Sequence, residues 1–136
     1  MRKLVQEATN LSSLVAVIGA SNDSDKFGYK IYRDLKNKGF TVLPINPNHN
    51  EIQGDKAYPS VIKAPFQIDI VNIVVPPDVA LEVIKEIKTA SLDPMPTIWL
   101  QPGSESEEII EYARKNGLPL VYGRCIMTES GKHTHV

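Results

Sequence analysis

The sequence of 136 residues has little cysteine, little charge imbalance and no long apolar run, and each shortage excludes a class of protein. Cys125 is the only cysteine, so an internal disulfide is excluded and a reducing compartment is favoured. A net charge of −1 leaves no basic field to hold a nucleic acid. No apolar run approaches the ~20 residues that span a bilayer, and residues 1–8 do not resemble a signal peptide. We therefore expect a cytoplasmic protein that binds neither membranes nor nucleic acids.

The sequence also lacks the residue groupings that mark common enzymes. It contains neither Gly-x-Gly-x-x-Gly nor a Walker loop ending in Gly-Lys-Ser/Thr, which leaves a kinase or NTPase without support. No paired carboxylates and no Ser/His/Asp set stand out. Cys125 has no identifiable base, which favours a small buried residue over a nucleophile. Together with His133 and His135 it does not match a zinc-site spacing. The sequence predicts a protein with no catalysis of its own and no metal.

What the sequence does contain is a regular alternation of strand and helix patterns. Apolar runs typical of buried parallel strands cover residues 14–18, 41–45, 70–75, 97–100 and 118–122. Amphipathic helical patterns cover about residues 28–38, 79–90 and 104–116. A short amphipathic helix is expected over about 1–12, an irregular segment over 51–65 and a polar surface tail over about 128–136. This order predicts one α/β domain over residues 1–136, a Rossmann-like three-layer fold with a mostly parallel sheet of about five strands.

Four residues carry more specific structural expectations. Pro44 lies inside the second strand, and because proline cannot donate to a ladder we expect that strand to be interrupted or to lie near an edge. Asp78 is a suitable N-cap for the helix that follows it. Ser104 is expected to cap the next helix in a capping box with Glu107. Trp99 is expected in the core.

Ligands of open parallel sheets bind outside the carboxyl ends of the strands, and this rule selects four loops: residues 19–28, 46–50, 76–77 and 101–103. The first loop combines small residues that allow close approach, a helix N-terminus that favours an anion, one hydroxyl and two cations. These residues are Gly19, Ala20, Ser21, Lys26, Gly28 and Lys30. The loop indicates phosphate binding, with an ordinary strand-to-helix turn as the alternative.

The other loops bear on which nucleotide is bound. NAD sites place a carboxylate at the end of the second strand, but here Asn46 and Pro47 follow Ile45, and Glu51 is the nearest acid. That arrangement suits a 3′-phosphorylated ribose, and Pro47 offers a flat surface to adenine or simply makes a turn. Pro76-Pro77 forms a stiff wall for a base or a pantetheine arm, or merely starts a helix.

Several stretches together resemble a known family. They are VAVIGAS (15–21), VLPINP (42–47), AYPS (57–60), WLQPG (99–103) and RCI (124–126). In this order they resemble the small stand-alone CoA-binding proteins, which are similar to the N-terminal CoA-binding domain of the succinyl-CoA synthetase α subunit. The resemblance covers about residues 12–128 and implies a five-stranded Rossmann-like fold that holds coenzyme A at the strand ends.

The resemblance also implies a role for individual positions. Gly19, Ala20, Ser21 and Gly28 would hold phosphates, although the synthetase loop is richer in glycine than this one. Ile45, Pro47 and His49 would flank the adenosine part. Val75 and Pro76 would line the base or pantetheine. Gln101 and Gly103 would close the site. The phosphorylated histidine of the synthetase belongs to a further domain that this chain lacks, so ligase activity is not implied.

The leading hypothesis is therefore a non-catalytic module that carries, senses or buffers CoA or acyl-CoA. The alternative is an NAD(P)-dependent oxidoreductase or another nucleotide-using enzyme. A third hypothesis is a regulatory protein that docks on a partner through its N-terminal helix, or that forms a homo-oligomer. A mixed disulfide between Cys125 and CoA would extend the first hypothesis.

Overall fold

A computed structural model describes residues 2–131, so His133 and His135 lie outside the described residues. In chain order the elements are α1 (Arg2–Val5), η1 (Gln6–Thr9), β1 (Leu14–Ile18), α2 (Phe27–Lys38), β2 (Thr41–Ile45), β3 (Glu51–Ile52), β4 (Asp55–Lys56), β5 (Ile70–Ile73), α3 (Pro77–Ala90), β6 (Thr97–Leu100), α4 (Glu107–Lys115), β7 (Leu120–Val121) and α5 (Ile126–Ser130). Within residues 2–131 no helix is both long and apolar enough to cross a bilayer.

Five parallel strands form the sheet, in the order β2-β1-β5-β6-β7. The chain leaves β1 through α2 to reach β2 on one side, and then returns across β1 to build β5, β6 and β7 on the other. The direction of winding therefore reverses between β1 and β5, which is where open α/β sheets bind ligands. The predicted Rossmann-like α/β class is confirmed.

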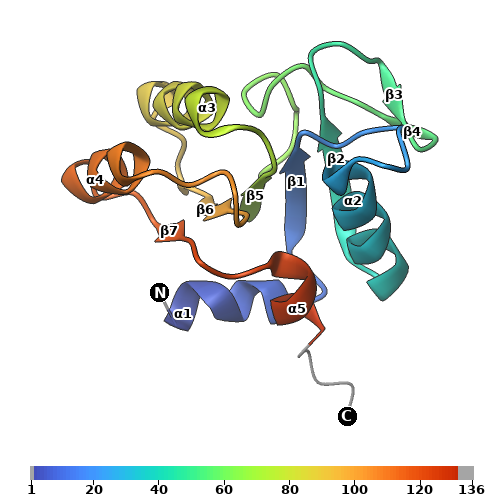
Figure 1. Cartoon of the computed structure of the whole chain (residues 1–136), viewed down its shortest axis with the longest axis horizontal. Coiled ribbons are helices and arrows are strands. Elements are labelled where there is room, and N and C mark those ends of the chain that lie inside the picture. Colours follow the sequence, from blue (N-terminus) through green and yellow to red (C-terminus); the bar gives the residue numbers. More distant parts are fainter. Residues whose placement is uncertain (1, 132–136) are drawn as a thin grey trace.

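Successive side chains of each strand point to opposite faces of the sheet, so each strand contributes to two hydrophobic cores. Ala16 and Ile18 join the core beneath α3 and α4, whereas Val15 and Val17 join the core beneath α2 and α5. Figure 1 shows these two helical layers on either side of the sheet. Trp99 is fully buried in the second core, as expected, and its indole N–H donates to the carbonyl of Arg124 (2.9 Å). Pro44 lies on the edge strand β2, opposite Val17.

Several expected element boundaries were wrong. The N-terminal helical segment ends at Thr9, and Leu11 is 39% exposed instead of sharing the buried face of Ala8. The third strand ends at Ile73, and the last is only Leu120–Val121. A two-stranded hairpin, β3–β4, lies within the segment expected to be irregular.

Both expected helix caps were also wrong. Pro76 is the N-cap of α3, so Asp78 lies within the first turn. Ser106 caps α4, accepting a hydrogen bond from the amide of Ile109 (3.2 Å). Ser104 is instead held in a preceding turn, where its amide donates to the carbonyl of Gln101.

Part of the expected polar tail is a buried helix. Residues 126–130 form α5, in which Glu129 and Ser130 are buried. The Lys38 ammonium of α2 fixes this helix by donating to the carbonyl of Met127 (2.6 Å) and to the hydroxyl of Ser130 (2.9 Å). A tertiary contact therefore orders a segment whose composition is typical of a surface tail.

Candidate functional site

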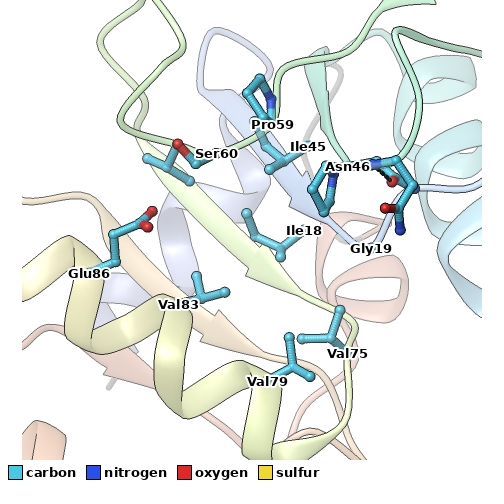
Figure 2. A pocket seen from close by; sticks show the side chains of 13 residues that line it. Ile18, Gly19, Ile45, Asn46, Pro59, Ser60, Val75, Val79, Val83 and Glu86 are labelled. Carbon is cyan, nitrogen blue, oxygen red and sulfur yellow. Dashed lines mark hydrogen bonds between the residues drawn. The ribbon is translucent and has the colours of Figure 1, made fainter.

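An apolar cavity of about 330 Å³ opens at the carboxyl ends of β1 and β2, at the point where the winding reverses. The size is within the range of small-molecule sites. It is lined by Ile18, Gly19, Ile45, Asn46, Pro47, Asn48, Pro59, Ser60, Val61, Val75, Val79, Val83 and Glu86. Figure 2 shows Val79, Val83 and Glu86 along one side of α3, facing the ends of the two strands. In the same view Ser60 and Glu86 lie toward one end, and Gly19 and Asn46 toward the other.

The wall formed by Pro59 and Ser60 is set by backbone pairing beside β2. The amide of Tyr58 donates to the carbonyl of Pro44 (3.1 Å), and the carbonyl of Tyr58 accepts from the amide of Asn46 (2.9 Å). These bonds extend the edge of the sheet by an isolated bridge between Ile45 and Tyr58. The residues that follow are thereby placed across the opening of the apolar cavity.

A second, more polar cavity of about 390 Å³ adjoins the first at the start of α2. It is lined by Gly19, Ala20, Ser21, Lys26, Phe27, Gly28, Asn46, Asn48 and Val74. Gly19, Asn46 and Asn48 line both cavities, so the two form one continuous surface. No side chain caps the N-terminus of α2. The N–H groups of Phe27 and Gly28 therefore remain available to an anion, and Lys26 adds a positive charge.

Two glycines let α2 start directly against the end of β1. A Cβ on Gly28 would lie 1.9 Å from the carbonyl oxygen of Gly19. Gly19 has φ of +99°, and a Cβ there would lie 2.7 Å from the carbonyl oxygen of Val74. Both positions therefore require glycine for backbone packing, and this packing brings the helix N-terminus to the sheet edge.

Asn46 occupies the position where NAD sites carry an acid. Its Nδ2 donates to the carbonyl of Ala20 (3.0 Å), and its Oδ1 accepts from the amide of Asn48 (2.8 Å). Both ends of the amide are thus engaged within the protein. The side chain thus shapes the loop, and as a neutral amide it lacks the negative charge of the acid that NAD sites carry there.

The expected site residues separate into two groups. Gly19, Ala20, Ser21, Lys26, Gly28, Ile45, Pro47 and Val75 line one or both cavities. Lys30, His49, Pro76, Gln101 and Gly103 line neither. Ser21 and Pro47 thus lie on adjoining parts of the surface, whereas Pro76 serves as the N-cap of α3.

Gln101 was expected to close the site, but its amide is used within the protein. Its Oε1 accepts from the amide of Ile126 (2.8 Å) and from Nδ2 of Asn72 (3.1 Å), and its Nε2 donates to Sγ of Cys125 (3.3 Å). Gln101 therefore ties the start of α5 to the sheet. Cys125 is a free thiol of intermediate burial. Among residues 2–131 no three His, Cys, Asp or Glu side chains gather closely enough to hold a metal ion.

Sequence reasoning missed the part of the lining that comes from α3. Val79, Val83 and Glu86 are four and three positions apart, which marks them as one stripe of a helix. The stripe is visible in the sequence, but the side of the helix that faces the cavity depends on how α3 crosses the sheet. Pro59 and Ser60 belong to the stretch AYPS, which carried part of the family resemblance.

The β3–β4 hairpin is anchored on α2 by a shared carboxylate. Oδ2 of Asp55 accepts from the hydroxyl of Tyr32 (2.6 Å) and from the ammonium of Lys36 (2.6 Å). The hydrogen bond from Lys36, and then that from Tyr32, hold the pKa of Asp55 below its usual value. Burial and the neighbouring carboxylate raise the pKa of Tyr32.

This anchor predicts a contribution to stability that depends on pH. The folded pKa of Asp55 is below the unfolded one, so its contribution is present above about pH 4 and is lost as the pH falls through the folded pKa. Wild type should therefore be more stable than Asp55→Asn at about pH 7, and the difference should shrink toward about pH 2. Urea unfolding of both proteins across this range measures it, and a constant difference would contradict the assignment.

A parallel sheet between helical layers, with a cavity where its winding reverses, defines a Rossmann-like protein of the nucleotide-binding class. The model of the CoA binding domain family matches residues 13–131, and the chain belongs to this family.

Relatives of two kinds were found. The α subunit of acetate–CoA ligase (ADP-forming) II from Pyrococcus furiosus is 34% identical over 120 residues, covering 82% of this chain and 26% of the subunit. This chain therefore spans about a quarter of that subunit's length. The uncharacterized protein YneT from Bacillus subtilis is 26% identical, with 90% of this chain and 88% of YneT covered. Among solved structures, a conserved hypothetical protein from Pyrococcus furiosus has 46% identity and a TM-score of 0.81, covering 86% of this chain and 98% of that one.

Proposed function

We propose that the protein binds coenzyme A or acyl-CoA with the adenine in the apolar cavity and the diphosphate at the start of α2. One observation carries the proposal: an apolar cavity adjoins an uncapped helix N-terminus along a shared edge formed by Gly19, Asn46 and Asn48. A flat base gains from leaving water for an apolar wall, and an anion gains from free N–H groups. A nucleotide diphosphate combines both requirements.

The polar groups of the apolar cavity suit adenine among the purines. Ser60 and Glu86 lie away from the diphosphate end, where the exocyclic group of a base would project (Figure 2). Adenine presents an amino donor there, which a carboxylate accepts. Guanine presents a carbonyl oxygen, which a carboxylate repels. This chemistry supports an adenine nucleotide.

A role in carrying or sensing CoA fits the residues better than turnover does. Among residues 2–131 no three His, Cys, Asp or Glu side chains gather closely enough to hold a metal ion, and Glu86 is the one carboxylate that lines the two cavities. Docking of a partner through the N-terminal helix has less support than expected, because Leu4 and Val5 pack against the protein's own core. The ligase subunit from Pyrococcus furiosus matches this chain over only 26% of its own length, so its activity is not carried over to this chain.

Isothermal titration with CoA and NAD tests the proposal. CoA should bind at least about tenfold tighter than NAD, a difference of about 1.4 kcal/mol, because no carboxylate at the end of β2 holds the ribose hydroxyls of the adenosine half of NAD. Acetyl-CoA should bind within about threefold of CoA, since the adenine and diphosphate contacts are shared. Tighter binding of NAD, or the absence of heat with CoA at high micromolar concentration, would overturn the proposal.

A further inference from the structure

Two side-chain amides from other parts of the chain hydrogen-bond the backbone of the loop between β1 and α2. Asn46 Nδ2 donates to the carbonyl of Ala20 (3.0 Å), and Gln53 Nε2 donates to the carbonyl of Ser21 (3.2 Å). Asn46 follows β2, and Gln53 is in the turn of the β3–β4 hairpin. Two successive carbonyls of the loop are therefore directed toward Asn46 and Gln53.

Pinning these carbonyls fixes where the neighbouring amides point. The only cis peptide bond among residues 2–131 joins Asp93 and Pro94, so the loop peptides are trans. In a trans peptide the N–H points opposite to the C=O. The amides of Ser21 and Asn22 therefore face away from Asn46 and Gln53. Neither amide has a hydrogen-bond acceptor within the described part of the chain.

Gln53 is held in its position by hydrogen bonds to both the loop and α2. Its φ of +50° is in the left-handed region, which is uncommon for a residue other than glycine. Its own amide donates to Oδ1 of Asn22 (2.7 Å), and Nδ2 of Asn22 donates back to the carbonyl of Glu51 (3.0 Å). Arg33 Nε donates to Oε1 of Gln53 (3.0 Å). Reciprocal bonds thus join the hairpin to the loop.

Gln53 also links the loop to the helix that follows it. Its Nε2 donates to the carbonyl of Tyr29 in the first turn of α2 (3.2 Å) as well as to that of Ser21. One side chain therefore sets the position of the loop relative to the helix N-terminus. The β3–β4 hairpin thereby holds the loop and the start of α2, which together form the candidate anion site.

We propose that Gln53 is a positioning residue for the diphosphate: by holding the carbonyl of Ser21 it aims the amide of Asn22 at the ligand without touching it, beside the amide of Ser21 that Asn46 orients. This inference rests on the proposed function, because the diphosphate is the group that those amides would bind. Gln53 lines neither cavity, so its effect must pass through the loop.

The test uses Gln53→Gly, which keeps the left-handed backbone accessible and removes only the side chain. Lys56→Ala in the same hairpin is the matched control, since its side chain makes no hydrogen bond to the loop among the described residues. We expect Gln53→Gly to bind CoA about tenfold more weakly, because charge-assisted hydrogen bonds are lost, and to bind adenosine unchanged. Lys56→Ala should match wild type with both ligands.

NMR titration separates this role from a general loss of structure. In wild type, CoA should shift the amide resonances of Ser21 and Asn22 and the methyl resonances of Val79. In Gln53→Gly the methyl shifts should persist with adenosine, while the amide shifts with CoA require about tenfold more ligand. Unchanged CoA affinity, or an equal loss for CoA and adenosine, would overturn the inference. Failure of wild type to bind CoA would instead overturn the proposed function, and this inference with it.

Discussion

Gly28→Ala is expected to lose CoA binding and about 3 kcal/mol of unfolding free energy, the upper part of the range for overpacked interiors. The added Cβ would lie 1.9 Å from the carbonyl oxygen of Gly19, and that oxygen belongs to backbone at the end of a central strand. Backbone cannot rotate away as a flexible side chain can. Alanine favours a helix by about 1 kcal/mol over glycine, which is too little to offset such a contact.

The loss of binding in Gly28→Ala follows from the same displacement. To relieve the contact, the start of α2 must move away from β1, and its free N–H groups move with it. Anion binding depends on the direction of these donors, so a small shift weakens it strongly. Urea unfolding and titration calorimetry measure the two effects.

Gly131→Ala is the control for this substitution. Its Cβ would meet its nearest neighbour at 3.4 Å, and its φ of −73° is open to any residue. Stability and CoA affinity should remain within experimental error of wild type. A Gly28→Ala protein as stable as wild type would show that α2 does not pack on the end of β1 as described.

Val79→Glu is expected to weaken CoA binding by about a hundredfold while leaving stability unchanged, because it places a carboxylate in the apolar cavity beside the proposed adenine. Val79 is 44% exposed, so little apolar burial is lost on substitution. It is also the third residue of α3, where a negative charge suits the helix N-terminus. The new carboxylate must lose water to admit the base, and it also repels the anionic ligand.

Thr89→Glu provides the matched control on the same helix. It makes the same change in net charge but is not among the residues that line the apolar cavity. Its CoA affinity should stay within about threefold of wild type. Equal losses in the two variants would indicate a long-range charge effect, and no loss in Val79→Glu would place the adenine elsewhere.

The proposed binding site lies within the segment that this chain shares with its larger relatives. The matched ligase subunit is about four times longer than the segment shared with this chain. The two cavities offer an apolar surface suited to a base and an uncapped helix N-terminus suited to a diphosphate.

The sequence by itself determined the five strands of the parallel sheet, although not all of their ends, and indicated the carboxyl edge of that sheet as the candidate site. Continuous apolar runs such as residues 14–18 are typical of strands buried on both faces, and such strands occur mainly in parallel sheets. The order of elements then fixes the carboxyl edge as the place for a ligand. Gly19 and Gly28 were also identified from sequence, although for ligand approach and not for the backbone contact between them.

Only the tertiary structure decided which polar side chains face that edge. Gln101 follows a strand as a ligand residue would, yet its amide is consumed by Asn72, Cys125 and Ile126. Gln53 lies in an inconspicuous hairpin, yet it holds the loop that starts α2. Local sequence determines backbone conformation through short-range sterics and burial. The partner of an amide is set by segments far along the chain, and these meet only when the sheet has assembled.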